Sequence, residues 1–213
     1  MPYVAQRLIA SLALVALGPL VVALAAAVRW TSRGPAFHRA VRVGPNDSRF
    51  ELLKLRTMHV GDDGPAITAA GDTRVTPLGR VLRRTKLDEL PQLWNVMRGE
   101  MALVGPRPED PRYVDWRDPL HREVFAARPG MTGPTAIAFR DEEALLVVEA
   151  RAIAAEEGAA VPTPEHLERA YRERVLPRKL AMDAQYLRAR SWRVDLGILG
   201  RTIGLVLRRT APS

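Results

Sequence analysis

Two adjacent carboxylates, Asp88 and Glu89, lie in the densest polar segment of the chain, Arg80–Gln92, beside several cations and before an apolar stretch. If Asp88 caps the helix expected here, it is a satisfied N-cap worth about 1 kcal/mol. If Thr85 is the cap, both acids lie in the first turn and Pro91 bends the helix. In either arrangement the positive end of the helix dipole favours the ionised, nucleophilic carboxylates.

A site that handles phosphate needs cations, and candidates flank the two acids in the sequence. They are Lys54, Arg56, Arg80, Arg83 and Arg107. Taken singly, each arginine is better explained as a solvated surface side chain. Arg107 is the exception, because Pro106 and Pro108 fix the direction of the backbone on both sides of it. An arginine locked in this way can hold a phosphate with little loss of conformational entropy.

Other chemistries are disfavoured by the motifs. The sequence has no Gly-x-Gly-x-x-Gly or Walker lysine loop and no Gly-x-Ser-x-Gly nucleophile elbow. The four histidines are scattered without metal-ligand spacing, and surface roles explain them best. The absence of cysteine excludes disulfides and thiolate metal sites.

The charge balance is basic, with 32 Lys and Arg against 24 Asp and Glu and a formal net charge of +8. Such a balance permits nucleic acid, an anionic membrane or phosphorylated small molecules as partners. A nucleic-acid protein would be expected to interleave aromatics with its basic stretch. Here that stretch carries leucines and carboxylates, so we expect no nucleic-acid partner.

An uncharged apolar run from Leu8 to Val28 predicts a membrane anchor over residues 1–31. A helix of this length reaches roughly 30 Å, about the thickness of the hydrocarbon layer. A cleaved signal peptide is disfavoured, because Arg29 follows the run where a small-residue cleavage site should lie. Gly18 and Pro19, near the midpoint, favour a kink. The residues alone leave a re-entrant helix and a simple span equally open, with the downstream side cytoplasmic.

Residues 32–213 predict one compact α/β domain that is dominated by helices. We expect a hairpin from strands Phe37–Val43 and Phe50–Met58, followed by a loop over Gly61–Thr76 and a non-helical turn at Gly105–Pro108. Helices are expected over Leu78–Arg84, Asp88–Met97 and Asp141–Glu157. A further helix should begin at the cap Thr163 with Pro164 in its first position, and a basic amphipathic helix should cover Val194–Arg209. The last helix either lies on the membrane surface or packs against the domain.

In order along the chain, these motifs resemble the bacterial sugar transferases, the monotopic polyprenyl-phosphate phosphoglycosyl transferases. The matching segments are Ser32–Phe37, Arg42–Gly44, Leu53–Met58, Thr73–Arg80, Leu87–Val96, Val104–Glu109, Arg128–Gly133 and Ser191–Leu207. The two that contain Asp88–Glu89 and Pro106–Pro108 are the most specific. The Gly18–Pro19 pair matches the helix-breaking pair of the family's re-entrant anchor, which favours a re-entrant helix here.

The resemblance implies an enzyme that moves a sugar phosphate from a UDP-sugar to polyprenyl (undecaprenyl) phosphate, with Mg²⁺, and releases UMP. Asp88 would form a covalent phosphosugar intermediate, and Glu89 would be its metal-binding or proton-handling partner, with both acids as metal ligands. An aspartyl intermediate divides the transfer into two displacements. Substrate-binding positions implied by the resemblance are Lys54, Arg56, Arg80, Arg83, Pro106, Arg107, Pro108, Arg128, Arg140 and Asp183.

The same resemblance implies a place on the cytoplasmic face of the bacterial inner membrane, contact with its lipids, and a role at the start of capsule, exopolysaccharide or O-antigen assembly. It leaves the oligomeric state open, with a homo-oligomer allowed. Two departures stand out: no acid follows Arg7 closely, and Pro134–Glu143 replaces an Asn-Gly-Arg stretch, so the sugar is undetermined. A non-enzymatic lipid- or nucleic-acid-binding protein and a degenerate scaffold are the alternatives, and the intact acids and cations oppose the scaffold.

Overall fold

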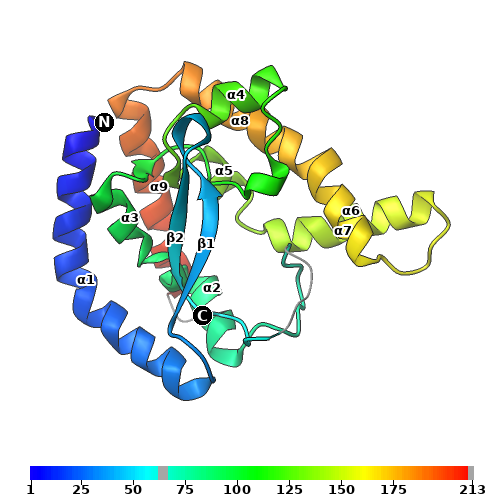
Figure 1. The fold of residues 1–213 in the computed structure, drawn as a ribbon, viewed down its shortest axis with the longest axis horizontal. Helices are drawn as coiled ribbons and strands as arrows, with labels where there is room; N and C mark the ends of the chain where they lie inside the picture. The colour runs from blue at the N-terminus through cyan, green and yellow to red at the C-terminus, as the bar shows by residue number, and fades with distance from the viewer. Residues whose placement is uncertain (62–66, 211–213) are drawn as a thin grey trace.

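The computed structural model describes residues 1–61 and 67–210, and confirms a helix-dominated α/β fold with a short hairpin. The α-helices are α1 (Tyr3–Thr31), α2 (Pro77–Thr85), α3 (Gln92–Arg98), α4 (Pro119–Phe125), α5 (Pro134–Ala138), α6 (Glu142–Glu156), α7 (Pro164–Arg169), α8 (Leu176–Arg188) and α9 (Trp192–Thr210). The strands are β1 (Phe37–Val43), β2 (Arg49–Leu55), β3 (Ala102–Val104) and β4 (Gly130–Thr132). In Figure 1 the hairpin lies between α1 and the protruding pair α6 and α7.

Helix α1 is long and apolar enough to cross a membrane by length and composition. Only 11% of its most apolar window is buried, whereas the core helix of a soluble domain would be mostly covered. The helix continues without interruption through Gly18 and Pro19, and Figure 1 shows that it changes direction along its length. A proline removes one backbone hydrogen bond and is the ordinary cause of such a bend.

The predicted hairpin is confirmed, with Phe37 opposite Leu55 and Val43 opposite Arg49 in an antiparallel register. Strand β2 ends before the predicted Met58, because Met58 forms an isolated bridge with Val75 instead. The expected loop follows, although its residues 62–66 lie outside the described part of the chain.

The segment that carries the two acids differs from the prediction of one helix from Asp88 to Met97. Leu87–Glu89 form a 3₁₀ turn, and α3 begins only at Gln92 with Pro91 in the N-cap position. Neither Thr85 nor Asp88 is therefore the cap. The reason is Lys86, which adopts a left-handed conformation (φ 60°) and redirects the chain between α2 and the acids. That conformation costs a residue with a side chain roughly 1–2 kcal/mol.

The turn at Gly105–Pro108 is non-helical, as predicted. It follows β3, which pairs with β4 in a two-stranded parallel sheet that was not predicted from the sequence. Ala102 of β3 lies opposite Gly130 of β4, and Val104 lies opposite Thr132. A Cβ on Gly130 would lie 2.1 Å from the backbone nitrogen of Gly105, so only glycine permits this approach. The end of β3 thus aims the proline-arginine-proline turn.

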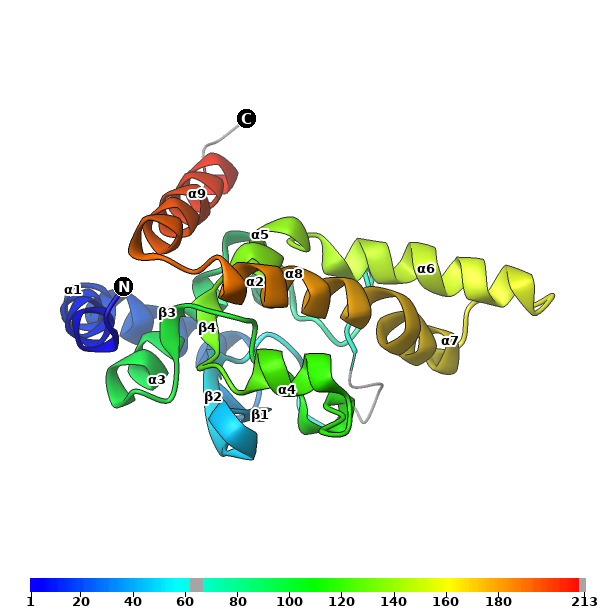
Figure 2. The same cartoon turned by 90° about the horizontal axis from the view of Figure 1, so that it is seen from above.

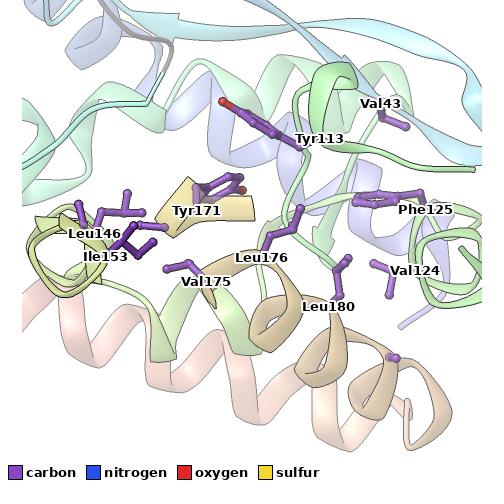
Figure 3. Close-up of a cluster of buried hydrophobic side chains, with 13 residues drawn as sticks. Val43, Tyr113, Val124, Phe125, Leu146, Ile153, Tyr171, Val175, Leu176 and Leu180 are labelled. Carbon is purple, nitrogen blue, oxygen red and sulfur yellow. The ribbon is translucent and has the colours of Figure 1, made fainter. Parts of the chain in front are cut away.

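The largest core cluster packs α4, α6 and α8 beneath the hairpin, and Figure 3 shows its side chains converging. Its buried members are Val43, Tyr113, Val124, Phe125, Leu146, Ala150, Ile153, Ala170, Tyr171, Val175, Leu176, Leu180 and Ala184. Between α7 and α8 the residues Ala170–Val175 form a π-helical turn just before Pro177, whose missing donor disrupts the regular ladder.

The predicted helix start at Thr163 and the predicted C-terminal helix are both confirmed. Thr163 and His166 form a reciprocal capping box at the start of α7. Helix α9 lies at one edge of the domain in Figure 2, where Ile198 packs into a core cluster with residues of α1 and β3, and Thr202 bonds Thr132 of β4. Trp192, Leu196 and Ile203 are exposed along it. The side chains of residues 207–210, which include two of the predicted basic residues, lie outside the described part.

Candidate active site

A cleft of about 1300 Å³ opens between the hairpin, α2, the turn after β3, and the start of α6. It brings together most of the predicted site residues from four separate stretches of the chain. Its lining includes Lys54, Arg56, Arg80, Arg83, Asp88, Glu89, Arg107, Pro108 and Arg140. Pro106, Arg128 and Asp183 do not belong to this lining.

Asp88 is buried, with 6% of its surface exposed, although it lines the cleft. Its Oδ1 atom is one of two buried side-chain polar atoms without a hydrogen-bond partner among the described residues. Burial raises the pKa of Asp88, and the neighbouring charge of Glu89 raises it further, while Lys54 acts in the opposite direction. A buried carboxylate oxygen without a partner, on a residue that lines a cleft, calls for an explanation, and a role in binding a cation or attacking an electrophile supplies one.

Glu89 is held as a carboxylate by the cations around it. Its Oε1 accepts a hydrogen bond from Nη2 of Arg107 at 3.4 Å and lies 3.9 Å from Nζ of Lys86. Burial alone would raise the pKa of Glu89, but Arg107, followed by Lys54 and Lys86, outweighs it and brings the pKa to about 2. The pair therefore consists of a firmly ionised Glu89 and a more basic Asp88.

Lys54 approaches the acids from β2, where it pairs across the hairpin with His38. Burial lowers the pKa of Lys54 to about 8, although Glu89 and Asp88 counteract that effect. The ammonium group of Lys54 has no hydrogen bond or salt bridge to any described residue. Its ammonium group is thus available to a phosphate that enters the cleft.

The remaining predicted cations differ in what they contact. Arg83 donates from Nε to Thr57 at 2.9 Å and from Nη1 to Glu143 at 2.9 Å. Arg140 pairs with the adjacent Asp141, and Arg80 is exposed at the cleft rim. Arg128 lies outside the cleft, with its guanidinium 4.4 Å from the centroid of the Tyr3 ring.

Arg56 lines the cleft but turns its guanidinium toward the end of α1. Its Nη2 donates to the carbonyl oxygen of Ser32 at 2.9 Å and to the Ser32 hydroxyl at 2.8 Å, and its Nη1 donates to the carbonyl oxygen of Arg33. These contacts satisfy carbonyl groups that the helix end leaves without partners. In the structure Arg56, which directly follows β2, joins the hairpin to the end of α1.

Asp183 is a buried partner of the arginine turn. Its carboxylate accepts hydrogen bonds from the Thr135 hydroxyl at 3.1 Å and from the backbone N–H of Arg107. Burial raises the pKa of Asp183 to about 7. The side chain lies behind the turn and fixes the backbone from which Arg107 reaches Glu89.

Replacing Asp183 with alanine should therefore loosen the turn. We expect Asp183→Ala to lower the free energy of unfolding by about 1–3 kcal/mol, because two buried donors lose their acceptor. Asp183→Asn keeps an acceptor oxygen and should lose less. Thermal unfolding in detergent measures both, and equal losses for the two variants would contradict a role in accepting these bonds.

A second polar cluster lines the cleft beyond Arg107, and sequence reasoning missed it. The buried ammonium of Lys179 contacts Glu142 at 3.0 Å, the Tyr171 hydroxyl at 3.1 Å and Glu109 at 3.9 Å, and the Tyr171 hydroxyl donates to Glu109. The charge of Glu89 raises the pKa of Arg107 most, and Glu142 and Glu109 of this cluster raise it further. The four-residue spacing of Lys179 and Asp183 on one helix was the available signal, since such residues share a face.

Among the described residues no group of three or more His, Cys, Asp or Glu is arranged to hold a metal ion by itself. Asp88 and Glu89 nevertheless fit a Mg²⁺ site, because Mg²⁺ is usually held by one or two carboxylates together with substrate phosphates. The unpartnered Oδ1 of Asp88 is the observation that favours this fit. The cleft therefore combines two hard oxygen donors with cations suited to phosphate.

Comparisons with known proteins agree with this chemistry. The chain is 48% identical over 120 residues to the UDP-glucose:undecaprenyl-phosphate glucose-1-phosphate transferase of Caulobacter vibrioides, covering 54% of this chain and 45% of that protein. It is 37% identical over 131 residues to an Aeromonas hydrophila protein named as a UDP-N-acetylgalactosamine-undecaprenyl-phosphate N-acetylgalactosaminephosphotransferase, covering 59% of this chain and 31% of the relative.

A third relative is the exopolysaccharide production protein ExoY of Sinorhizobium fredii, 38% identical over 152 residues, or 63% of this chain and 67% of that protein. The match to the Caulobacter protein covers less than half of that protein's own length. The family model described as bacterial sugar transferase matches residues 3–209, nearly the whole chain. The chain therefore belongs to the bacterial sugar transferase family.

Proposed function

We propose that this protein transfers a sugar-1-phosphate from a UDP-sugar to polyprenyl phosphate and yields polyprenyl-diphosphate-sugar and UMP. Relatives named as undecaprenyl-phosphate sugar-phosphate transferases support the reaction class. The observation that carries the proposal is Asp88, a residue of the cleft lining whose buried Oδ1 has no hydrogen-bond partner among the described residues, beside cations of a type suited to phosphate. Membership of the family alone would not identify the reacting atom.

The chemistry divides into two displacements at one phosphorus atom. In the first, the Asp88 carboxylate attacks the β-phosphorus of the UDP-sugar, and the bond from that phosphorus to the bridging oxygen breaks to release UMP. In the second, an oxygen of polyprenyl phosphate attacks the same phosphorus, and the bond to Asp88 breaks. The carboxylate is regenerated, and no external oxidant or proton source is required.

The surrounding residues lower the barrier by holding charge in place. Arg107 and Lys54 face the acids and would bind the equatorial phosphate oxygens, whose charge must be stabilised as the transfer proceeds. Bound Mg²⁺ would supply further electrostatic stabilisation of the diphosphate. Asp88 and Glu89 would hold that ion, and the low pKa of Glu89 keeps its carboxylate ionised for the purpose.

The anchor gives the reaction access to its lipid substrate. We propose that α1 re-enters the membrane from the cytoplasmic face of the inner membrane and that α9 lies on the surface beside it. The exposed apolar faces of α1 and α9 support this placement. The product would begin assembly of a surface glycan, as the name of the Sinorhizobium relative indicates for that protein.

The pH dependence of kcat/KM for the donor should be bell-shaped. Asp88 must be ionised to attack, so activity falls as pH drops through its raised pKa. Lys54 must be protonated to attract phosphate, so activity also falls as pH rises above its pKa of about 8. Lys54→Arg should move the alkaline limb upward, because a guanidinium stays charged there. An unmoved alkaline limb would remove Lys54 from this role.

The proposed reaction is tested directly by incubating the purified protein with polyprenyl phosphate, Mg²⁺ and a panel of UDP-sugars in detergent. UDP-glucose and UDP-N-acetylgalactosamine come first, because relatives are named for those sugars. We expect UMP release and a new lipid-linked sugar with at least one donor. Release of UDP in place of UMP would show glycosyl transfer and contradict the proposal.

A further inference from the structure

A second pocket lies at the C-terminal end of α1 and has a volume of about 530 Å³. We call it the α1 pocket, and its lining is Arg29, Trp30, Thr31, Ser32, Arg33, His59 and Val60. His59 and Val60 also line the catalytic cleft. The α1 pocket therefore adjoins the cleft, on the side where the apolar helix ends.

The α1 pocket carries positive charge that no described carboxylate neutralises. Arg29 and Arg33 are exposed, and neither forms a salt bridge with another described residue. Arg56 lies behind the Ser32 backbone with only 6% of its surface exposed. Burial lowers the pKa of Arg56 and the charge of Arg29 lowers it further, which shows that these cations repel one another.

Arg56 holds this arrangement in place without cancelling its charge. The hydrogen bonds of its guanidinium to described residues all go to carbonyl oxygens and one hydroxyl of residues 28–33, and its buried Nε has no partner among the described residues. Gly34 (φ 115°) lets the loop wrap around it, since a Cβ there would lie 2.0 Å from Nη1 of Arg56. Three guanidinium groups are thus held in one region with no described counter-charge, which favours an anionic ligand.

The position of the α1 pocket indicates which anion it receives. It sits at the end of the apolar helix, where Trp30 is 87% exposed in the manner of an aromatic side chain at a membrane interface. A phosphate monoester carries a charge of about −1.5 to −2 at neutral pH, which exceeds that of a phospholipid diester. Three guanidinium groups suit the monoester better.

We infer that the α1 pocket receives the phosphate of the polyprenyl phosphate acceptor before that phosphate passes His59 and Val60 into the cleft. Arg29 and Arg33 would bind the phosphate directly, and Arg56 is a positioning residue behind them. This inference rests on the proposed function, and it concerns only the second displacement. The donor half of the reaction should not depend on the α1 pocket.

The test is the double variant Arg29→Gln/Arg33→Gln, assayed in detergent micelles so that attachment to a bilayer does not limit the rate. We expect the KM for polyprenyl phosphate to rise roughly 10- to 30-fold, since each arginine near a lipid phosphate contributes a factor of several. Formation of UMP from donor alone, one turnover per enzyme, should be unchanged. The matched control is Arg49→Gln/Arg151→Gln, which removes two exposed arginines remote from the α1 pocket and should keep the native KM.

An unchanged acceptor KM in the Arg29→Gln/Arg33→Gln variant would overturn the inference. A parallel assay measures flotation with phosphatidylglycerol vesicles that lack polyprenyl phosphate. Loss of flotation together with a native acceptor KM would assign the α1 pocket to ordinary phospholipid and would also overturn it. Failure of the unaltered enzyme to release UMP would instead contradict the proposed function, so the two failures are distinguishable.

Discussion

Asp88→Asn should lower UMP release from the donor by about 10⁴-fold or more, the scale at which loss of a nucleophile acts in covalent catalysis. The amide has nearly the same shape as the carboxylate but cannot form the bond to phosphorus. The unfolding temperature of the Asp88→Asn variant should be unchanged or higher, because burial disfavours a charge at this position and raises the pKa of Asp88. Loss of activity with retained stability would locate the defect in the chemistry.

The covalent step provides the sharper readout. Native enzyme trapped with donor alone should gain the mass of one phosphosugar on the peptide that contains Asp88, and the Asp88→Asn variant should gain none. Asp118→Asn is the control, because it removes one carboxylate from an exposed N-cap where asparagine caps equally well. It should keep native turnover. An adduct on Asp88→Asn, or turnover near the native rate, would remove Asp88 from the mechanism.

The parts of this site that the sequence predicted are those that local spacing determines. Asp88 and Glu89 are neighbours in the chain, so any fold keeps them together. Pro106 and Pro108 restrict the backbone on both sides of Arg107, so its turn was predictable as well. Turn residues and alternating apolar positions likewise defined the hairpin without tertiary information.

The errors occurred where a tertiary contact overrides local preference. Nothing in the type of Lys86 indicates a left-handed conformation, so the break between α2 and α3 was placed wrongly. Strands β3 and β4 have only three residues each, too few for an alternation to be seen. Lys179 and Tyr171 contact Glu109 across more than 60 residues of sequence. Helical spacing places Lys179 on the same face as Asp183, but it does not identify Glu109 as the partner.

Arg56 illustrates why residue type alone is a weak guide to a role. A motif arginine beside Lys54 predicts phosphate binding, but the structure directs its side chain to the end of α1. Two residues apart on one strand share a face, yet their long side chains diverge toward a helix end and toward the acids. Helix α1 and the candidate catalytic centre are consequently joined through Lys54 in β2 and Arg56 just after it, which keeps the acids at a fixed distance from the end of α1.

Arg107→Gln should be the second most damaging change, with kcat/KM for the donor lowered by about 10²–10³-fold, the usual loss when one preorganised donor to a developing charge is removed. Arg107→Lys should recover part of this loss, because an ammonium keeps the charge without the two-pronged geometry. Arg112→Gln is the control, since its exposed guanidinium pairs with Asp110 and does not itself line the cleft. It should retain native kinetics.

The pH profile then separates binding of phosphate from the effect of Arg107 on the acids. Arg107 is the strongest of the cations that lower the pKa of Glu89, so its removal raises that pKa. Glu89 then takes up a proton at a higher pH than in the native enzyme. Because the proposed reaction needs both acids ionised, the acid limb of kcat/KM that Asp88 sets should become steeper at its low-pH end. A variant with weaker donor binding but an unchanged acid limb would show that Arg107 acts on the substrate alone and leaves Glu89 unaffected.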